Sequence, residues 1–199
     1  VSDAGGIFSC LQLVEETPRP VCERLMTLPL QSPGVCAYLS VAGEARPPYL
    51  RFFLPGDGQL CRLLVRPEVI SPELRRDGRA PARLIAPMRH AEAERLGPDG
   101  QRAYLDRILA EPWWREHVGE TRVLDARIPS RWGADFHLYR DSMNPVMTAR
   151  LMRRGRLPHR YPFARGLYLA GSATHPGQWV SFCAISGVLA ADRLREDLR

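Results

Sequence analysis

The sequence of 199 residues contains no lysine, and all 28 of its basic residues are arginine. A P-loop lysine, a Schiff-base lysine and a lysine general base are therefore excluded. The formal charge is +6, but acidic residues are interleaved with the arginines, as in PELRRDGR at 72–79. Proteins that bind nucleic acid gather basic residues on one face, so we expect no nucleic-acid partner.

The sequence also lacks cysteine pairs and long apolar runs. Its cysteines, Cys10, Cys22, Cys36, Cys61 and Cys183, are odd in number, form no C-x-x-C pair and have no closely spaced histidine. We expect free thiols in a reducing cytoplasm and no metal site. No run of about 18 apolar residues could span a membrane, and no secretory segment opens the chain. The first residues, VSDAGG, begin without methionine, and we expect this stretch to be internal to a larger protein.

Helical and strand patterns alternate along the chain. Apolar residues recur at helical spacing over 8–28, where Pro18 and Pro20 divide the pattern into two short helices. Aromatic and β-branched runs over 33–88 predict an antiparallel sheet, with a hairpin turn at PGDGQ, 55–59, and a closing segment ARLIAPM, 82–88. Residues 98–118 predict a helix with Asp99 as its N-cap, followed by strand character over 121–132. The fold class is therefore α+β, without internal repeats.

Two features bear on contact with a membrane. Trp113 and Trp114 end an amphipathic helix and are expected in the core, although aromatic residues beside arginines also occur at lipid surfaces. Residues 147–162 hold five arginines: Arg150, Arg153, Arg154, Arg156 and Arg160. This segment is either a solvated connector or a basic rim that docks on anionic lipid or on a partner. We expect a cytoplasmic protein, with peripheral membrane contact as the alternative.

The most informative stretch is GLYLAGSATHPGQWVSFCAISGVLAADRL, residues 166–194. Its apolar run at 167–170 predicts a buried strand of a parallel sheet, and a helix is expected from Trp179 or Val180. The helix N-terminus offers unpaired N–H groups, and the preceding loop has no acidic residue to neutralise them. An anion or an electron-rich carbonyl is the expected guest, but the phosphate-binding motifs are absent. The residues alone leave a ligand site and an ordinary strand-to-helix connection equally open.

This stretch resembles the C-terminal FAD-binding motif of the phytoene desaturase-like flavoproteins, which include carotenoid desaturases, carotenoid isomerases and retinol saturases. In that family an apolar strand leads to Gly, small residues, Thr-x-Pro-Gly and a helix carrying Ser-Gly-x-x-Ala-Ala. The matching residues are Gly171, Thr174, Pro176, Gly177, Ser186, Gly187, Ala190 and Ala191. Looser similarities cover VSDAG at 1–5, LQSPGVCAYLSV at 30–41 and RIPSRWGADFHLY at 127–139.

The resemblance implies the C-terminal part of a two-domain FAD/NAD(P)-binding Rossmann-type flavoprotein. Residues 1–16 would form the edge of the FAD domain, 17–158 a substrate-binding domain with an antiparallel sheet, and 159–199 the final strand, loop and helix. FAD would be bound by Gly171, Ser172, Thr174, His175, Pro176, Gly177, Gln178, Trp179 and Val180. The substrate would be hydrophobic, of polyene or isoprenoid type, with an apolar sheet over 50–65 to receive it. His175, His137 and Tyr139 are the candidate proton donors.

The chain departs from the family at Gln178-Trp179-Val180-Ser181, where members commonly have Gly-Gly-Val-Pro, and Ser172 replaces an acidic residue found in many flavoproteins of this fold. The Gly-x-Gly-x-x-Gly half of the cofactor domain is not in these 199 residues. We therefore expect a partial oxidoreductase that is inactive without a complementary N-terminal half, which would be its partner if the enzyme is split. The alternatives are a non-catalytic interaction module and a fragment of an amine-oxidase-like flavoprotein.

Overall fold

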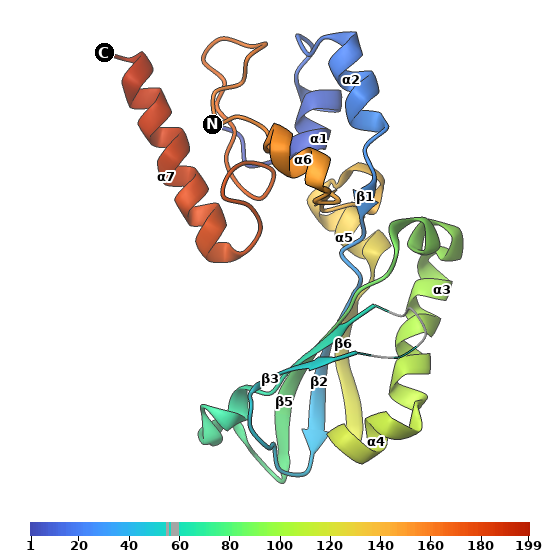
Figure 1. Ribbon diagram of the computed structural model, residues 1–199. Coiled ribbons are helices and arrows are strands. Elements are labelled where there is room, and N and C mark those ends of the chain that lie inside the picture. Colours follow the sequence, from blue (N-terminus) through green and yellow to red (C-terminus); the bar gives the residue numbers. More distant parts are fainter. Residues whose placement is uncertain (55, 57–59) are drawn as a thin grey trace. The chain divides into compact units, whose positions relative to one another are not determined.

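The computed structural model describes residues 1–54, 56 and 60–199, which form two compact units. One unit comprises Ser32–Trp132, and the other combines Val1–Gln31 with Gly133–Arg199 (Figure 1). The chain is mixed α/β with antiparallel sheets, in agreement with the predicted α+β class. The predicted bounds at 16 and 158 separate the expected parts of an FAD domain from an expected substrate-binding domain. This division stays a prediction.

The unit Ser32–Trp132 is built on a five-stranded antiparallel sheet in the order β3-β4-β5-β2-β6. Its strands are β2 (Val35–Ala42), β3 (Leu50–Phe53), β4 (Arg62–Val65), β5 (Arg79–Ala86) and β6 (Thr121–Arg127), with short 3-10 turns η2 (Pro67–Val69) and η3 (Pro72–Leu74). β2 pairs with β5 along its whole length, from Val35 opposite Ala86 to Ala42 opposite Arg79. The predicted antiparallel sheet is confirmed. The predicted hairpin turn falls on residues 55 and 57–59, which lie outside the described residues.

Two helices, α3 (His90–Ala110) and α4 (Pro112–Val118), accompany this sheet. α3 is interrupted at Gly97, whose φ of 61° is outside the helical range. The prediction of Asp99 as an N-cap was wrong, because Asp99 lies within the helix, two residues after this break. Pro98 has a fixed φ and no N–H, which suits the first position after the break. The break at Gly97 therefore lies two residues before the position where the capping residue was expected.

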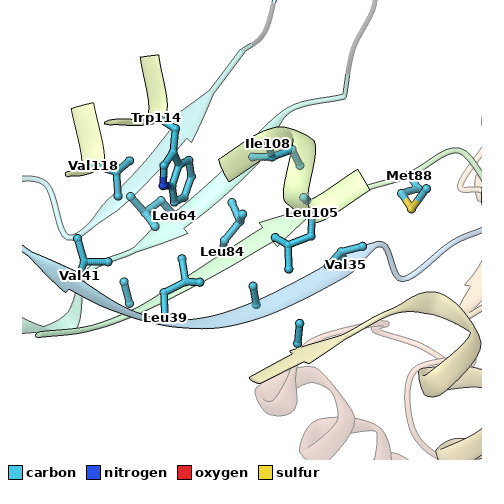
Figure 2. Close-up of a cluster of buried hydrophobic side chains, with 14 of the residues drawn as sticks. Val35, Leu39, Val41, Leu64, Leu84, Met88, Leu105, Ile108, Trp114 and Val118 are labelled. Carbon is cyan, nitrogen blue, oxygen red and sulfur yellow. The ribbon is translucent and has the colours of Figure 1, made fainter. Parts of the chain in front are cut away.

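The core of this unit lies between the sheet and the helices. Figure 2 shows Leu105, Ile108, Trp114 and Val118 from the helices beside the strand residues Leu39, Val41, Leu64 and Leu84. Trp114 is only 1% exposed, and Trp113 packs against the same cluster, so the prediction that this pair belongs to the core is confirmed. Side chains alternate across a strand, so residues such as Tyr38 and Phe52 lie on the opposite, more exposed face.

The other unit contains mostly short elements. They are α1 (Gly6–Phe8), the π-helical turn η1 (Ser9–Leu13), α2 (Arg19–Met26), β1 (Leu30–Gln31), η4 (Tyr139–Asp141), β7 (Asn144–Pro145), α6 (Ala149–Arg154) and α7 (Val180–Asp197), while α5 is formed by Pro129–Phe136. β1 and β7 pair antiparallel. The two predicted helical stretches over 8–28 are confirmed, and so is the start of the last helix at Val180.

The strand predicted at 167–170 is present only as an extended, buried segment. Leu169 forms a single parallel bridge with Ser2, and Tyr168 a single antiparallel bridge with Arg160. Ser2 donates to the Tyr168 carbonyl at 2.8 Å, and the Ala170 N–H donates back to the Ser2 carbonyl at 2.9 Å. Each neighbouring segment pairs with 167–170 through only one residue, so these bridges do not make a regular strand.

A second buried cluster surrounds Tyr161 in this unit, with Ile7, Cys10, Leu25, Leu30 and Leu169. Tyr161 is 4% exposed, and its hydroxyl forms a hydrogen bond with Thr17 Oγ1. Burial raises the pKa of Tyr161 to about 12, and burial also raises the pKa of the Cys10 thiol. The folded state therefore holds the Tyr161 proton more tightly than the unfolded state, in which tyrosine has a pKa of about 10.

We predict a specific loss of stability at alkaline pH. The contribution of Tyr161 is fully present below pH 10 and is lost as pH rises towards 12, because the unfolded phenol ionises first. Urea unfolding of wild type should lose about 1 kcal/mol more between pH 9 and pH 11 than that of Tyr161→Phe. Since the chain has no lysine, this window is free of lysine titration. The exposed Tyr49→Phe serves as the control and should follow wild type; equal losses in all three proteins would contradict the prediction.

Candidate functional site

The loop before α7 is joined to the helix by a buried network of three motif residues. Ser186 Oγ accepts from the Gly171 N–H at 2.9 Å and lies 2.5 Å from Thr174 Oγ1. Thr174 Oγ1 also donates to the Gly171 carbonyl at 3.0 Å. Thr174 and Ser186 are fully buried, so both hydroxyls act within the protein. These hydrogen bonds fix the path of the loop relative to α7.

Arg156 supports the same loop from a distant part of the sequence. Its Nη1 donates to the Ser172 carbonyl at 2.9 Å, and its guanidinium lies against Gly177. The φ of Gly177 is 132°, which favours glycine, and a Cβ there would stand 2.7 Å from Arg156 Nη2, so the guanidinium would have to shift. Sequence analysis placed Arg156 only in a basic segment and missed this contact, since nothing in the spacing of 156 and 177 indicates it.

Trp179 has a backbone conformation that glycine usually supplies. Its φ is 92° and its ψ is 145°, close to a region that residues with a Cβ almost never occupy. Its indole is 73% exposed, so packing of the side chain does not explain this conformation. The strain falls at the position where the resembling family has glycine.

The N-terminus of α7 is open to a ligand. No side-chain cap bonds to its first turn within the described chain, and that turn contains no acidic residue. Val180 is 89% exposed at this end. The first N–H groups of a long helix carry partial positive charge and can hold an anion or a carbonyl oxygen. This donor set fits the carbonyl-bearing ring of a flavin, whereas the chain offers no motif for the pyrophosphate of FAD.

A cavity of about 580 Å³ lies in the same unit as this loop. Its wall includes residues from α1, α2, η4, β7 and the segment 155–158, together with Ala173 of the loop. Of the candidate proton donors, Tyr139 lines the cavity, and the His137 ring lies 5.9 Å from the ring of Phe8, which also lines it. His175 is exposed on the loop and is not among the residues that line the cavity. Sequence analysis missed the lining residues Arg24 and Asn144, which have no motif around them.

Some arginines of the basic segment 147–162 bond to other parts of the protein. Arg160 forms a bidentate ion pair with Asp197 at 2.7 and 2.5 Å, and the Tyr168 hydroxyl donates to the same carboxylate. The Arg160 guanidinium holds the pKa of Asp197 below its usual value. Arg150 and Arg153 are exposed, so a basic rim stays a prediction for these two. No helix in the described residues is long and apolar enough to cross a membrane.

One side of α7 presents apolar side chains to solvent. Ser186 and Ala190 are buried on its inner side, while Phe182, Ile185 and Val188 are exposed at helical intervals on another. The outer apolar residues form a surface that can receive another protein segment.

Comparison with known proteins adds no relative: models of known protein families give no match to this chain, and neither do curated proteins. In the part of the chain that the structure describes, no group of three His, Cys, Asp or Glu side chains is placed to hold a metal ion. The resemblance to the phytoene desaturase-like flavoproteins therefore depends on the motif residues alone.

We predict that the Trp179→Gly variant is more stable against unfolding than the Trp179→Ala variant. At an ordinary site alanine is favoured by about 0.4–1 kcal/mol, because glycine is more flexible in the unfolded chain. The backbone of Trp179 reverses this order, since such a sparsely populated conformation costs a residue with a Cβ about 1–3 kcal/mol. Urea unfolding should rank Trp179→Gly above Trp179→Ala by about 1 kcal/mol. A ranking with alanine above glycine would mean that residue 179 has ordinary backbone geometry.

Proposed function

We propose that the chain is the C-terminal part of an FAD-dependent oxidoreductase of the phytoene desaturase-like family, with the two-domain Rossmann-type architecture of that family. The single observation that carries this proposal is the backbone of Trp179, which adopts a glycine-type conformation where the family has glycine. The network of Gly171, Thr174 and Ser186 supports it, because these motif residues bond to one another and hold the loop open at the start of α7.

The loop and helix would bind the ring end of FAD. The backbone from Gly177 to Val180 would lie along the ring, and the N–H groups at the start of α7 would hold its carbonyl oxygens. Gly171 and Ser172 would lie near the ribityl chain, and His175, Pro176 and Gln178 complete the loop. Thr174 would act as a positioning residue, since its hydroxyl is bonded to Gly171 and Ser186. Bound flavin would supply the redox chemistry by accepting or returning a hydride.

The protein's own task would be to bind and orient a hydrophobic substrate in a dry site. The cavity beside the loop is large enough for part of a long apolar molecule, of polyene or isoprenoid type. Tyr139 on its wall, His137 beside Phe8 and His175 on the loop are the candidates to move a proton. The location would be cytoplasmic, and exposed arginines such as Arg150 and Arg153 would support peripheral contact with a membrane.

The complementary N-terminal half would supply the pyrophosphate-binding fingerprint, and the chain alone would not turn over. The exposed apolar side of α7, with Phe182, Ile185 and Val188, is a surface on which such a partner could pack. The same surface supports the second candidate function, a non-catalytic interaction module, because an interaction module needs an exposed apolar face but no cofactor.

Co-expression with an N-terminal half of the family tests this proposal. The two pieces should purify together and show an absorbance band near 450 nm, about where oxidised flavins absorb. Val180→Glu should lose most of this band without loss of co-purification, because its carboxylate would oppose the ring carbonyls at the start of α7, while Val180 itself is exposed.

The matched control is Val180→Gln, which has the same size without the charge and should retain more flavin. A complex that co-purifies but stays colourless would overturn the oxidoreductase and favour the interaction module. Equal flavin content in the Glu and Gln variants would place the cofactor elsewhere.

A further inference from the structure

The cavity has the size and the lining of a ligand site. Its volume is about 580 Å³, within the range of pockets that enclose small organic molecules. The described residues that line it all belong to the unit that contains both chain ends. Apolar side chains dominate the wall, among them Ile7, Leu25, Leu28, Met147, Leu151 and Leu157.

One buried polar group in the wall has an unused donor. Asn144 is 3% exposed, and its Nδ2 has no hydrogen-bond partner among the described residues. β7 holds the backbone of Asn144 in place through its pairing with Gln31 on β1. A buried amide donor without a partner is destabilising, so an acceptor from a bound molecule would relieve a cost that the protein bears alone.

The charges around the cavity have one sign. Arg24 and Arg156 belong to the wall, and no aspartate or glutamate is found among the described residues that line it. Arg156 uses Nη1 for the Ser172 carbonyl, and Arg24 is exposed at the surface. The site is thus apolar along most of its wall, with two guanidinium groups and one amide donor, and this combination favours an oxygen-bearing anion with an apolar body.

We propose that this cavity binds a monocarboxylate with a long apolar chain, with the chain against the apolar wall and the carboxylate oxygens towards Asn144 and the arginines. A pure hydrocarbon would leave the Asn144 amide without a partner, and a cation would be repelled. The inference deepens the proposed function, because it names the class of substrate. It rests on the proposed function only in calling the ligand a substrate that the complete enzyme converts. Binding itself requires no flavin.

The test uses cis-parinaric acid, a fluorescent polyene carboxylate, and its uncharged methyl ester, each titrated into the full chain without flavin. The acid should bind with saturable fluorescence and about tenfold more tightly than the ester, because charge-assisted hydrogen bonds are the stronger ones. Asn144→Leu should weaken binding of the acid about tenfold. Its unfolding midpoint should stay equal or rise, since the substitution removes an unpartnered buried donor.

Two further variants keep the result interpretable. Gln12→Leu replaces an exposed amide outside the cavity and should bind the acid like wild type. Met147→Trp fills the cavity and should abolish binding of both probes. The proposal is overturned if acid and ester bind equally, if Asn144→Leu retains full affinity for the acid, or if no saturable binding occurs. A flavin-free complex in the co-expression experiment would leave a positive result here intact, so the two proposals can fail separately.

Discussion

The hydrogen bonds of Ser186 are the interaction on which the candidate site depends. This one hydroxyl, buried on the inner side of α7, joins the Gly171 N–H and the Thr174 hydroxyl to the helix. Because the loop is fixed at these points, the exposed residues Trp179 and Val180 stand at the start of α7, while Gly177 is buried against Arg156. Arg156 holds the loop from the other side through the Ser172 carbonyl. The two Ser186 contacts explain why the motif needs hydroxyls at 174 and 186.

Arginine takes structural roles here that lysine cannot fill in the same way. Arg156 and Arg160 tie the segment 147–162 to the loop and to α7, and Arg62 forms a bidentate pair with Glu111 in the other unit. The planar guanidinium can bond two oxygens at once, which suits fixed partners of this kind. A high count of basic residues is therefore no measure of a nucleic-acid surface, since several of them are committed to partners inside the fold.

The sequence predicts those helices and strands whose formation depends on neighbouring residues along the chain. The aromatic and β-branched runs over 33–88 and the helical spacing after Val180 were sufficient to predict the sheet and the last helix. The sequence could not show that the segment 167–170 pairs through isolated bridges in place of a regular strand. Its partners, Ser2 and Arg160, lie outside the segment and were not indicated by its pattern. The cavity could not be predicted either, since it joins residues as distant as Arg24 and Asn144. The positive φ of Trp179 could be expected only from the resemblance, because the family has glycine at this position. A tryptophan by itself does not indicate a positive φ.

The central claim is that the start of α7 holds a flavin ring. Hydrogen exchange of the backbone amides of Val180, Ser181 and Phe182 tests it most directly, measured on the co-purified complex with flavin and after its removal. We predict that exchange at these three amides slows when flavin is bound, while the amide of Leu198, which follows the C-terminal end of α7 and donates to the Leu194 carbonyl, does not change. Unchanged exchange at residues 180–182 in a complex that has bound flavin would contradict the account.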